Sequence, residues 1–281
     1  MATQPRGVAM EVKGADGTPL TYDVSGDGEP LVLIHGSWGE RQTWGLVIPA
    51  LAESFRVISY DRRGHGESSA SPDIGTVHDD VADVVAVIDE LADGRAHLVG
   101  NSYGACIALR MAAAHPERLA RMVCHEPPML GVLEADDDGK PIADEERRKL
   151  GEVRQRLERG DYADAAEYFV ERVAFGPGAW SELPPPLQQM FVKHAPTFLG
   201  ELRDGDALGA DLESLRQLKT PILLTHSPDS PAFFAPIVER LAILLPNARR
   251  RLLSDIGHVP HMTHPDEYAP VVLDFLLEQH G

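Results

Sequence analysis

The sequence predicts an α/β protein with a mostly parallel sheet, flanking helices and one inserted helical lid, or cap. Strand and helix signals alternate between residues 30 and 125, which is typical of a parallel sheet. Residues 129–218, here called the helical insertion, look helical and polar and carry no strand signal. We therefore expect an α/β core made of residues 1–128 and 219–281, with the helical insertion placed after the sixth strand.

The first four strands follow from runs of apolar and β-branched residues. Residues 8–13 and 20–25 flank a turn signal at Ala15-Asp16-Gly17 and predict two paired strands. Residues 30–34 form an aliphatic run that ends at a glycine, as in a strand buried on both faces. Residues 55–60 predict a fourth strand.

Helical spacing of apolar residues alternates with further strands in the next part of the chain. Residues 44–54, 77–91 and 105–114 predict helices. Residues 96–100 and 122–125 predict the fifth and sixth strands. After the helical insertion the same alternation resumes, with strands at residues 221–225 and 249–253 and helices at residues 233–245 and 268–279.

Composition limits the partners and the compartment. The formal charge of −18 repels nucleic acid and anionic lipid, so we expect neither as a partner. No stretch approaches the ~20 apolar residues of a membrane span, and residues 1–7 lack a signal-peptide core. Cys106 and Cys124 fall in predicted core elements, which favours small buried side chains and a reducing cytoplasm. The oligomeric state stays open, and a homodimer is one arrangement to test.

A candidate nucleophile lies between the fifth strand and the following helix. Gly100-Asn101-Ser102-Tyr103-Gly104 matches G-x-S-x-G in the strand–turn–helix context that this motif requires. The two glycines allow a sharp turn that projects the Ser102 hydroxyl, and the helix N-terminus directs N–H groups toward developing negative charge. An ordinary N-cap serine would not require both glycines.

A base and an oxyanion hole are predicted at the same edge of the sheet. His258 follows the last strand, and a base after the nucleophile and the acid is the order found in α/β-hydrolases. Ser37 follows the third strand, and its backbone N–H can pair with that of Tyr103 to hold an oxyanion. His261 and His264 are expected to be ordinary loop histidines.

Four motifs together resemble the α/β-hydrolase superfamily. They are Ile34-His35-Gly36-Ser37-Trp38, Asp61-Arg62-Arg63-Gly64-His65-Gly66-Glu67-Ser68, Gly100-Asn101-Ser102-Tyr103-Gly104 and Gly257-His258. The resemblance covers the chain outside the helical insertion and implies the serine-nucleophile branch. It assigns a structural role, and no chemistry, to residues 61–68. Haloalkane dehalogenases and epoxide hydrolases are expected to carry Asp at position 102.

Two carboxylates compete as the acid that orients His258. Asp229 follows the seventh strand, the commonest position in the family, but Ser227-Pro228 departs from the usual Gly-then-Asp pattern. Glu126 directly follows the sixth strand, a position used by some α/β-hydrolases. Cys124-His125-Glu126 resembles the strand end of the fungal zearalenone lactonases, which also use a serine nucleophile. We favour Glu126 and keep Asp229 as the alternative.

The helical insertion is expected to shape the substrate pocket. Trp180 resembles the lid tryptophan of the zearalenone lactonases, and Met129 and Leu130 begin the insertion. Further candidates for an apolar lining are Met190, Phe191 and Phe198.

The predicted function is hydrolysis of a small hydrophobic carboxylic ester or lactone through an acyl-enzyme, without metal or cofactor. A zearalenone-type macrolactone is the specific candidate substrate. Carbon–carbon bond hydrolases and cofactor-free perhydrolases share the same triad and remain alternatives. A non-catalytic binding protein on the same fold is a further alternative, because fold does not fix function.

Overall fold

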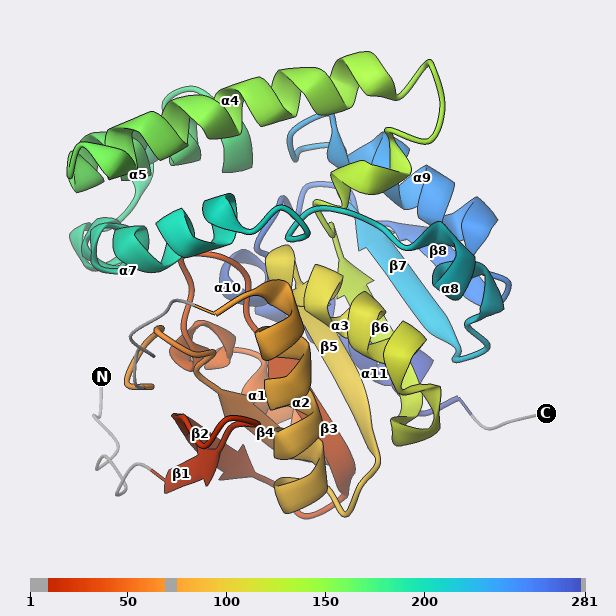
Figure 1. Ribbon diagram of the computed structural model, residues 1–281. Helices are drawn as coiled ribbons and strands as arrows, with labels where there is room; N and C mark the ends of the chain where they lie inside the picture. Colours follow the sequence, from red (N-terminus) through yellow and green to blue (C-terminus); the bar gives the residue numbers. More distant parts are fainter. Residues whose placement is uncertain (1–9, 69–74, 279–281) are drawn as a thin grey trace.

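The computed structural model describes residues 10–68 and 75–278, and these form a single eight-stranded sheet with helices on both faces (Figure 1). The strand order is β1-β2-β4-β3-β5-β6-β7-β8. The strands are β1 Met10–Lys13, β2 Pro19–Ser25, β3 Glu29–Ile34, β4 Phe55–Tyr60, β5 Ala96–Asn101, β6 Leu119–His125, β7 Ile222–His226 and β8 Ala248–Leu252.

Only the two pairs that β2 makes, with β1 and with β4, are antiparallel. β1 pairs with β2, and β2 with β4, in antiparallel register, whereas β3 to β8 run parallel to one another. The carboxyl ends of β3, β5, β6 and β7 therefore meet at one edge of the sheet. In a doubly wound sheet this is the edge where ligands bind.

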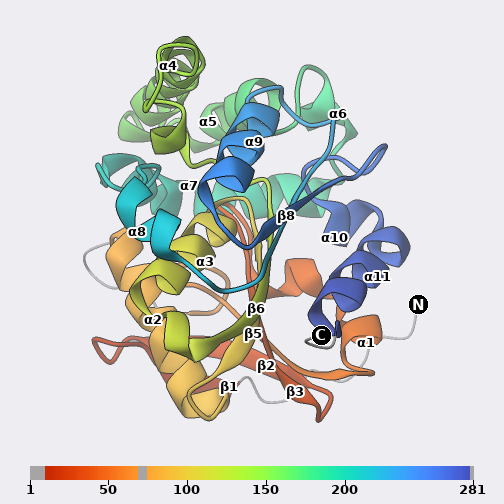
Figure 2. The same cartoon turned by 90° about the vertical axis from the view of Figure 1, so that its right-hand side faces the viewer.

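Two helical layers cover the two faces of the sheet, as Figure 2 shows from the side. One apolar core includes side chains of α2 (Val77–Leu91), α3 (Tyr103–Ala114) and α9 (Phe234–Leu244). The other core includes side chains of α1 (Ile48–Leu51) and α11 (Pro265–Leu276). Cys106 and Cys124 are free thiols buried in the first core, as the sequence predicted.

The predicted α/β class is confirmed, but one predicted helix is wrong. The expected helix at residues 44–54 is a 3₁₀ turn, Arg41–Trp44, followed by the short helix α1. Pro49 explains the break, because proline has no backbone N–H. A continuous helix over residues 44–54 would need that N–H to bind the carbonyl group of residue 45. The expected first strand begins at Met10 in the structure, and residues 8 and 9 lie outside the described part.

The helical insertion contains helices and turns throughout and no strand, and all of its residues are described. Its elements are η3 Leu130–Val132, α4 Lys140–Glu158, α5 Tyr162–Phe169, the π-helical turn η4 Val170–Ala174, α6 Ala179–Glu182, α7 Pro185–Arg203 and α8 Leu212–Gln217. α4, α5 and α7 lie above the carboxyl edge of the sheet (Figure 1). Their apolar side chains pack around Trp38, which comes from the loop after β3.

The remaining short elements are η2 (Pro116–Arg118) and α10 (Pro260–Thr263). Within residues 10–68 and 75–278, no helix combines the length and the apolar character needed to cross a membrane.

His261 of α10 is part of the core, whereas the sequence suggested an ordinary loop histidine. Its ring stacks on Trp44, with 4.1 Å between the ring centroids, and both side chains are buried. Burial, with smaller contributions from His125 and His258, lowers the pKa of His261 to about 3. The folded protein therefore holds this imidazole in its neutral form at neutral and mildly acidic pH.

This burial predicts a pH-dependent stability difference between the wild type and His261→Phe. An unfolded chain binds a proton at His261 below its ordinary value of 6.5, whereas the folded chain does so only near 3. The stability due to this site is complete above pH 6.5 and is lost as the pH falls toward 3. Between pH 7.5 and pH 5 the wild type should lose roughly 2 kcal/mol relative to His261→Phe. Denaturant unfolding at both pH values measures this change, and a constant difference would contradict the assignment.

Candidate active site

Ser102 occupies a strained turn between β5 and α3. Its backbone has φ 54° and ψ −124°, a region that side-chain-bearing residues rarely adopt. The Ser102 N–H donates a hydrogen bond to the His125 carbonyl at 2.8 Å, which ties the turn to the end of β6. Strain of this kind persists only where the surrounding structure supports it, and it is concentrated at functional sites.

The two glycines of the motif permit the close approach of strand and helix. A Cβ atom on Gly104 would lie 2.2 Å from the Ile34 carbonyl oxygen on β3. A Cβ atom on Gly100 would lie 2.6 Å from the Gly104 carbonyl oxygen. Both distances are far below van der Waals contact, so any side chain at either position would push α3 away from the sheet.

Glu126 and His258 form a buried hydrogen-bonded pair at the same edge. Glu126 Oε2 lies 2.6 Å from His258 Nδ1, and the glutamate side chain is fully buried. The Ser227 N–H donates to the other carboxylate oxygen at 2.7 Å. Because an ionised carboxylate only accepts hydrogen bonds, Nδ1 of His258 carries a proton, and in the neutral ring Nε2 then keeps its lone pair.

The charge of Glu126 is stabilised by its neighbours. Burial alone would raise the pKa of this carboxyl group, but His125, His258 and the Ser227 N–H overcome that effect and lower it. Glu126 is therefore ionised at neutral pH, as required of a group that orients a histidine and stabilises its protonated form.

Asp229 lies elsewhere. Its carboxylate accepts hydrogen bonds from the Asp255 N–H at 2.7 Å and from the Ser227 hydroxyl at 3.2 Å. It therefore supports the loop that carries His258 without a hydrogen bond to the His258 ring. Of the two acids considered from the sequence, the structure brings Glu126 to His258.

His125, Glu126 and His258 also come close enough together to be considered as metal ligands. The chemistry of His125 does not fit that role. Its Nε2 lies 3.1 Å from the Gly257 carbonyl oxygen, which only accepts, so Nε2 carries a proton and offers no lone pair. Burial lowers the pKa of His125 to about 4, so this ring is a neutral donor that supports the His258 loop through the Gly257 carbonyl.

The backbone N–H groups of Ser37 and Tyr103 are the two oxyanion donors expected from the sequence. Ser37 follows β3, where a Cβ atom on the preceding Gly36 would lie 3.0 Å from the Ser102 Cβ atom. Tyr103 is the first residue of α3. Within the described part of the chain, neither N–H donates to another protein group.

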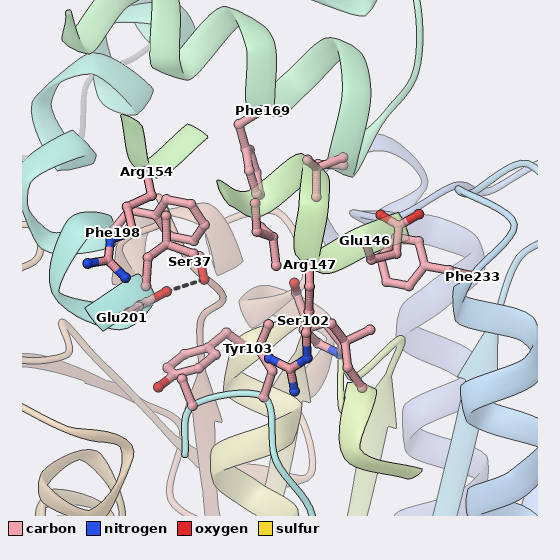
Figure 3. Close-up of a pocket in the computed structure, with 18 of the residues that line it drawn as sticks. Ser37, Ser102, Tyr103, Glu146, Arg147, Arg154, Phe169, Phe198, Glu201 and Phe233 are labelled. Atoms are coloured by element: carbon pink, nitrogen blue, oxygen red, sulfur yellow. Dashed lines mark hydrogen bonds between the residues drawn. The ribbon is translucent and has the colours of Figure 1, made fainter. Parts of the chain in front are cut away.

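A cavity of about 250 Å³ joins these groups to the helical insertion (Figure 3). Ser37, Ser102, Tyr103 and His258 all line it. Its walls are mostly apolar and include Leu130, Leu150, Phe169, Phe198, Phe233 and Phe234. Charged side chains also border it, namely Glu146, Arg147, Arg154, Glu201 and Asp204.

The structure places some of the expected pocket residues at this cavity and others elsewhere. Leu130 and Phe198 line the cavity, but Trp180, Met129, Met190 and Phe191 do not. Trp180 packs edge-on against Phe191 at 6.4 Å, within the apolar cluster of the helical insertion itself. Met129 turns into the core beneath α2 and α3 and borders a separate, smaller hollow.

Three residues at the site were missed in the sequence. Phe234 stacks on His258 with 4.5 Å between the ring centroids. Glu201 of α7 reaches the cavity and contacts Ser37 and Arg62, and its burial raises its pKa. Arg62 belongs to a motif to which only a structural role was assigned. No local pattern marks Glu201, because its partners lie far away in the chain.

Residues 31–271 match the model of the alpha/beta hydrolase family, so the chain belongs to that family. The fold and the strand–turn–helix position of Ser102 agree with this membership.

The relatives have varied activities. The chain is 30% identical to a 2-hydroxymuconate semialdehyde hydrolase of Pseudomonas sp. (strain CF600), over 90% of this chain and 89% of that protein. It is 28% identical to a non-heme chloroperoxidase of Streptomyces lividans, over 94% and 98% of the two chains. Among solved structures it is similar to Est816, described as an N-acyl homoserine lactone degrading enzyme, with TM-score 0.77, 25% identity and coverage of 95% and 100%.

The close contact at Gly104 predicts that a single added methyl group strongly lowers the free energy of unfolding. Gly104→Ala should reduce the free energy of unfolding by about 3 kcal/mol, because backbone atoms of β3 cannot move aside easily. Gly151→Ala in α4 is the matched control, since a Cβ atom there meets nothing within 4 Å. That change should stabilise the protein by about 0.5–1 kcal/mol. Denaturant unfolding of both variants tests the pair, and equal effects would contradict it.

Proposed function

We propose that this protein hydrolyses a carboxylic ester or lactone through an acyl-enzyme on Ser102. The observation that supports this most strongly is the buried Glu126–His258 pair, because His258 lines the same cavity as Ser102. In this proposal Ser102 is the nucleophile, His258 the general base and Glu126 the acid that orients it.

In the first step, the Nε2 lone pair of His258 accepts the hydroxyl proton as Ser102 Oγ attacks the carbonyl carbon. No hydrogen bond joins Ser102 Oγ to the His258 ring in the structure, so these two described side chains must come into contact before the attack. The tetrahedral oxyanion accepts hydrogen bonds from two backbone N–H groups. One is that of Ser37, in the loop after β3, and the other is that of Tyr103, at the N-terminus of α3. Glu126 stabilises the imidazolium without taking its proton.

In the second step, His258 donates its proton to the leaving alkoxide. A water molecule then loses a proton to His258 and attacks the acyl-enzyme, and Ser102 leaves with the proton returned. In a lactone the alkoxide stays attached to the acyl chain, and the product is a single hydroxy acid. The steps require no metal or organic cofactor.

The substrate is proposed to be small and hydrophobic, because aromatic and aliphatic side chains form most of the cavity wall. The similarity to a lactone-degrading enzyme supports including lactones. A zearalenone-type macrolactone is the narrower proposal, and it rests on the Cys124-His125-Glu126 strand end. The position of Trp180 outside the cavity removes the second feature of that resemblance.

A second candidate is hydrolysis of a carbon–carbon bond. It is favoured by the 30% identity to the Pseudomonas 2-hydroxymuconate semialdehyde hydrolase over nine-tenths of this chain. The same nucleophile and base would serve that reaction, so only substrate tests separate the two candidates.

The proposed nucleophile is tested by comparing the wild type with Ser102→Ala. The wild type should hydrolyse p-nitrophenyl acetate and should react with a fluorophosphonate probe, whereas Ser102→Ala should do neither. Loss of zearalenone, followed by chromatography, tests the narrower proposal with the same two proteins.

Each result has a distinct meaning. Ester turnover without zearalenone turnover would contradict the proposal of a macrolactone substrate and would support the broader proposal of an esterase. Turnover of a ring-cleavage product at a much higher kcat/KM than any ester would favour the second candidate. A folded wild type that neither turns over ester nor reacts with the probe would contradict the proposal as a whole.

The proposed acid is tested by Glu126→Gln and Asp229→Asn. Glu126→Gln should lower kcat by roughly hundredfold or more, because an amide can present its N–H to His258 and favour the wrong tautomer. Asp229→Asn should change kcat by less than about fivefold, because Asp229 only supports the loop. Steady-state kinetics on the same ester measures both, and the reverse order would contradict the assignment.

A further inference from the structure

Glu201 connects the helical insertion to the loop that carries one oxyanion donor. It lies near the end of α7 and is almost completely buried, and its Oε2 accepts a hydrogen bond from the Ser37 hydroxyl at 2.5 Å. Figure 3 shows the Glu201 side chain directed at Ser37 across the cavity wall. Residues 37 and 201 belong to different parts of the fold, so this bond forms only when α7 is docked on the core.

The other carboxylate oxygen of Glu201 binds Arg62. Glu201 Oε1 lies 2.8 Å from Arg62 Nη2, and Asp80 of α2 holds the same guanidinium with contacts of 3.1 and 2.9 Å. The Arg62 side chain is 2% exposed. Its position is thus fixed by two carboxylates, from α2 and from the helical insertion.

Arg62 also contacts the elements that hold both oxyanion donors. Its guanidinium carbon lies 4.7 Å from the centre of the Tyr103 ring, and its backbone N–H donates to His35 Nε2 at 3.0 Å. His35 directly precedes the Gly36-Ser37 turn and donates from Nδ1 to the Gly36 carbonyl at 2.8 Å. The Glu201–Arg62 ion pair therefore lies against Tyr103 on one side and against the Ser37 loop on the other.

We propose that Glu201 is a positioning residue, which holds the Ser37 N–H in the geometry that binds the oxyanion. This inference rests on the proposed function. The physical basis is that a buried carboxylate keeps strict positions for its hydrogen-bond partners, since leaving it unpaired is costly. A donor must lie close to where the oxyanion forms, so a small shift of the loop lowers the rate while substrate binding is retained.

A simpler role for Glu201 would be to fasten α7 to the core. Thr197, one turn earlier in α7, already does this, because its hydroxyl donates to the Gly64 carbonyl at 2.8 Å. That bond does not involve Ser37, Arg62 or Tyr103. Thr197→Val is therefore the matched control for a loss of contact between α7 and the core.

The experiment is a double-mutant cycle of Ser37→Ala and Glu201→Gln, with kcat and KM measured on p-nitrophenyl acetate. Ser37→Ala keeps the backbone N–H and removes only the hydroxyl that binds Glu201. Each single variant should lower kcat about tenfold with KM changed less than twofold. The double variant should also lose about tenfold, because Ser37→Ala already removes the hydroxyl through which Glu201 acts on the loop, so Glu201→Gln adds no further loss. Thr197→Val should leave kcat within twofold of the wild type.

Other outcomes would overturn the inference. A double variant that loses about a hundredfold would mean that the two side chains act independently. Unchanged kcat in both single variants, with a lower melting temperature like that of Thr197→Val, would assign Glu201 to structure alone. Should Glu201→Gln fail to fold, Ser37→Ala still decides, since it leaves the Glu201–Arg62 ion pair in place. A wild type inert toward the ester would instead contradict the proposed function, and the inference with it.

Discussion

The Glu126 carboxylate has no contact with solvent, and the arrangement of the site depends on its charge. A buried ion is tolerated only when hydrogen bonds and opposite charge replace the water that it has lost. Here the end of β7 supplies the Ser227 N–H, the loop after β8 supplies His258, and His125 lies next to the carboxylate in sequence. The positive φ of Glu126 turns its side chain toward these partners at the carboxyl edge of the sheet.

Much of the fold could be predicted because its signals are local. Aliphatic runs gave the buried strands, and β4 and α2 begin and end where the sequence indicated. The same holds for Ser102, whose strained turn requires glycine on both sides within five residues. The predicted helix at residues 44–54 failed because apolar spacing alone does not reveal where Pro49 interrupts hydrogen bonding.

The walls of the cavity were harder to predict, because they depend on how separate helices meet. Trp180 and Leu130 are equally apolar in the sequence, yet only Leu130 borders the cavity. Trp180 packs within the helical insertion, and Met129 turns toward α2 and α3. The contacts of Glu201 could not be predicted for the same reason, since its partners Ser37 and Arg62 are 164 and 139 residues away in the sequence. Periodicity indicates which face of a helix is buried, but not which distant group it will contact.

The position of the helical insertion in the chain also determines when the site is complete during synthesis. Ser102 and the two proposed oxyanion donors, Ser37 and Tyr103, lie before residue 104, whereas His258 is 132 residues beyond Glu126. In the proposed mechanism, a chain emerging from the ribosome therefore contains its serine long before it contains the base that would activate it. β7 must pair with β6, and the last loop must close over Glu126, before proton transfer can begin. Under the proposed mechanism, a chain that ends before His258 cannot activate Ser102, so activity requires that the segment from β7 to His258 has docked.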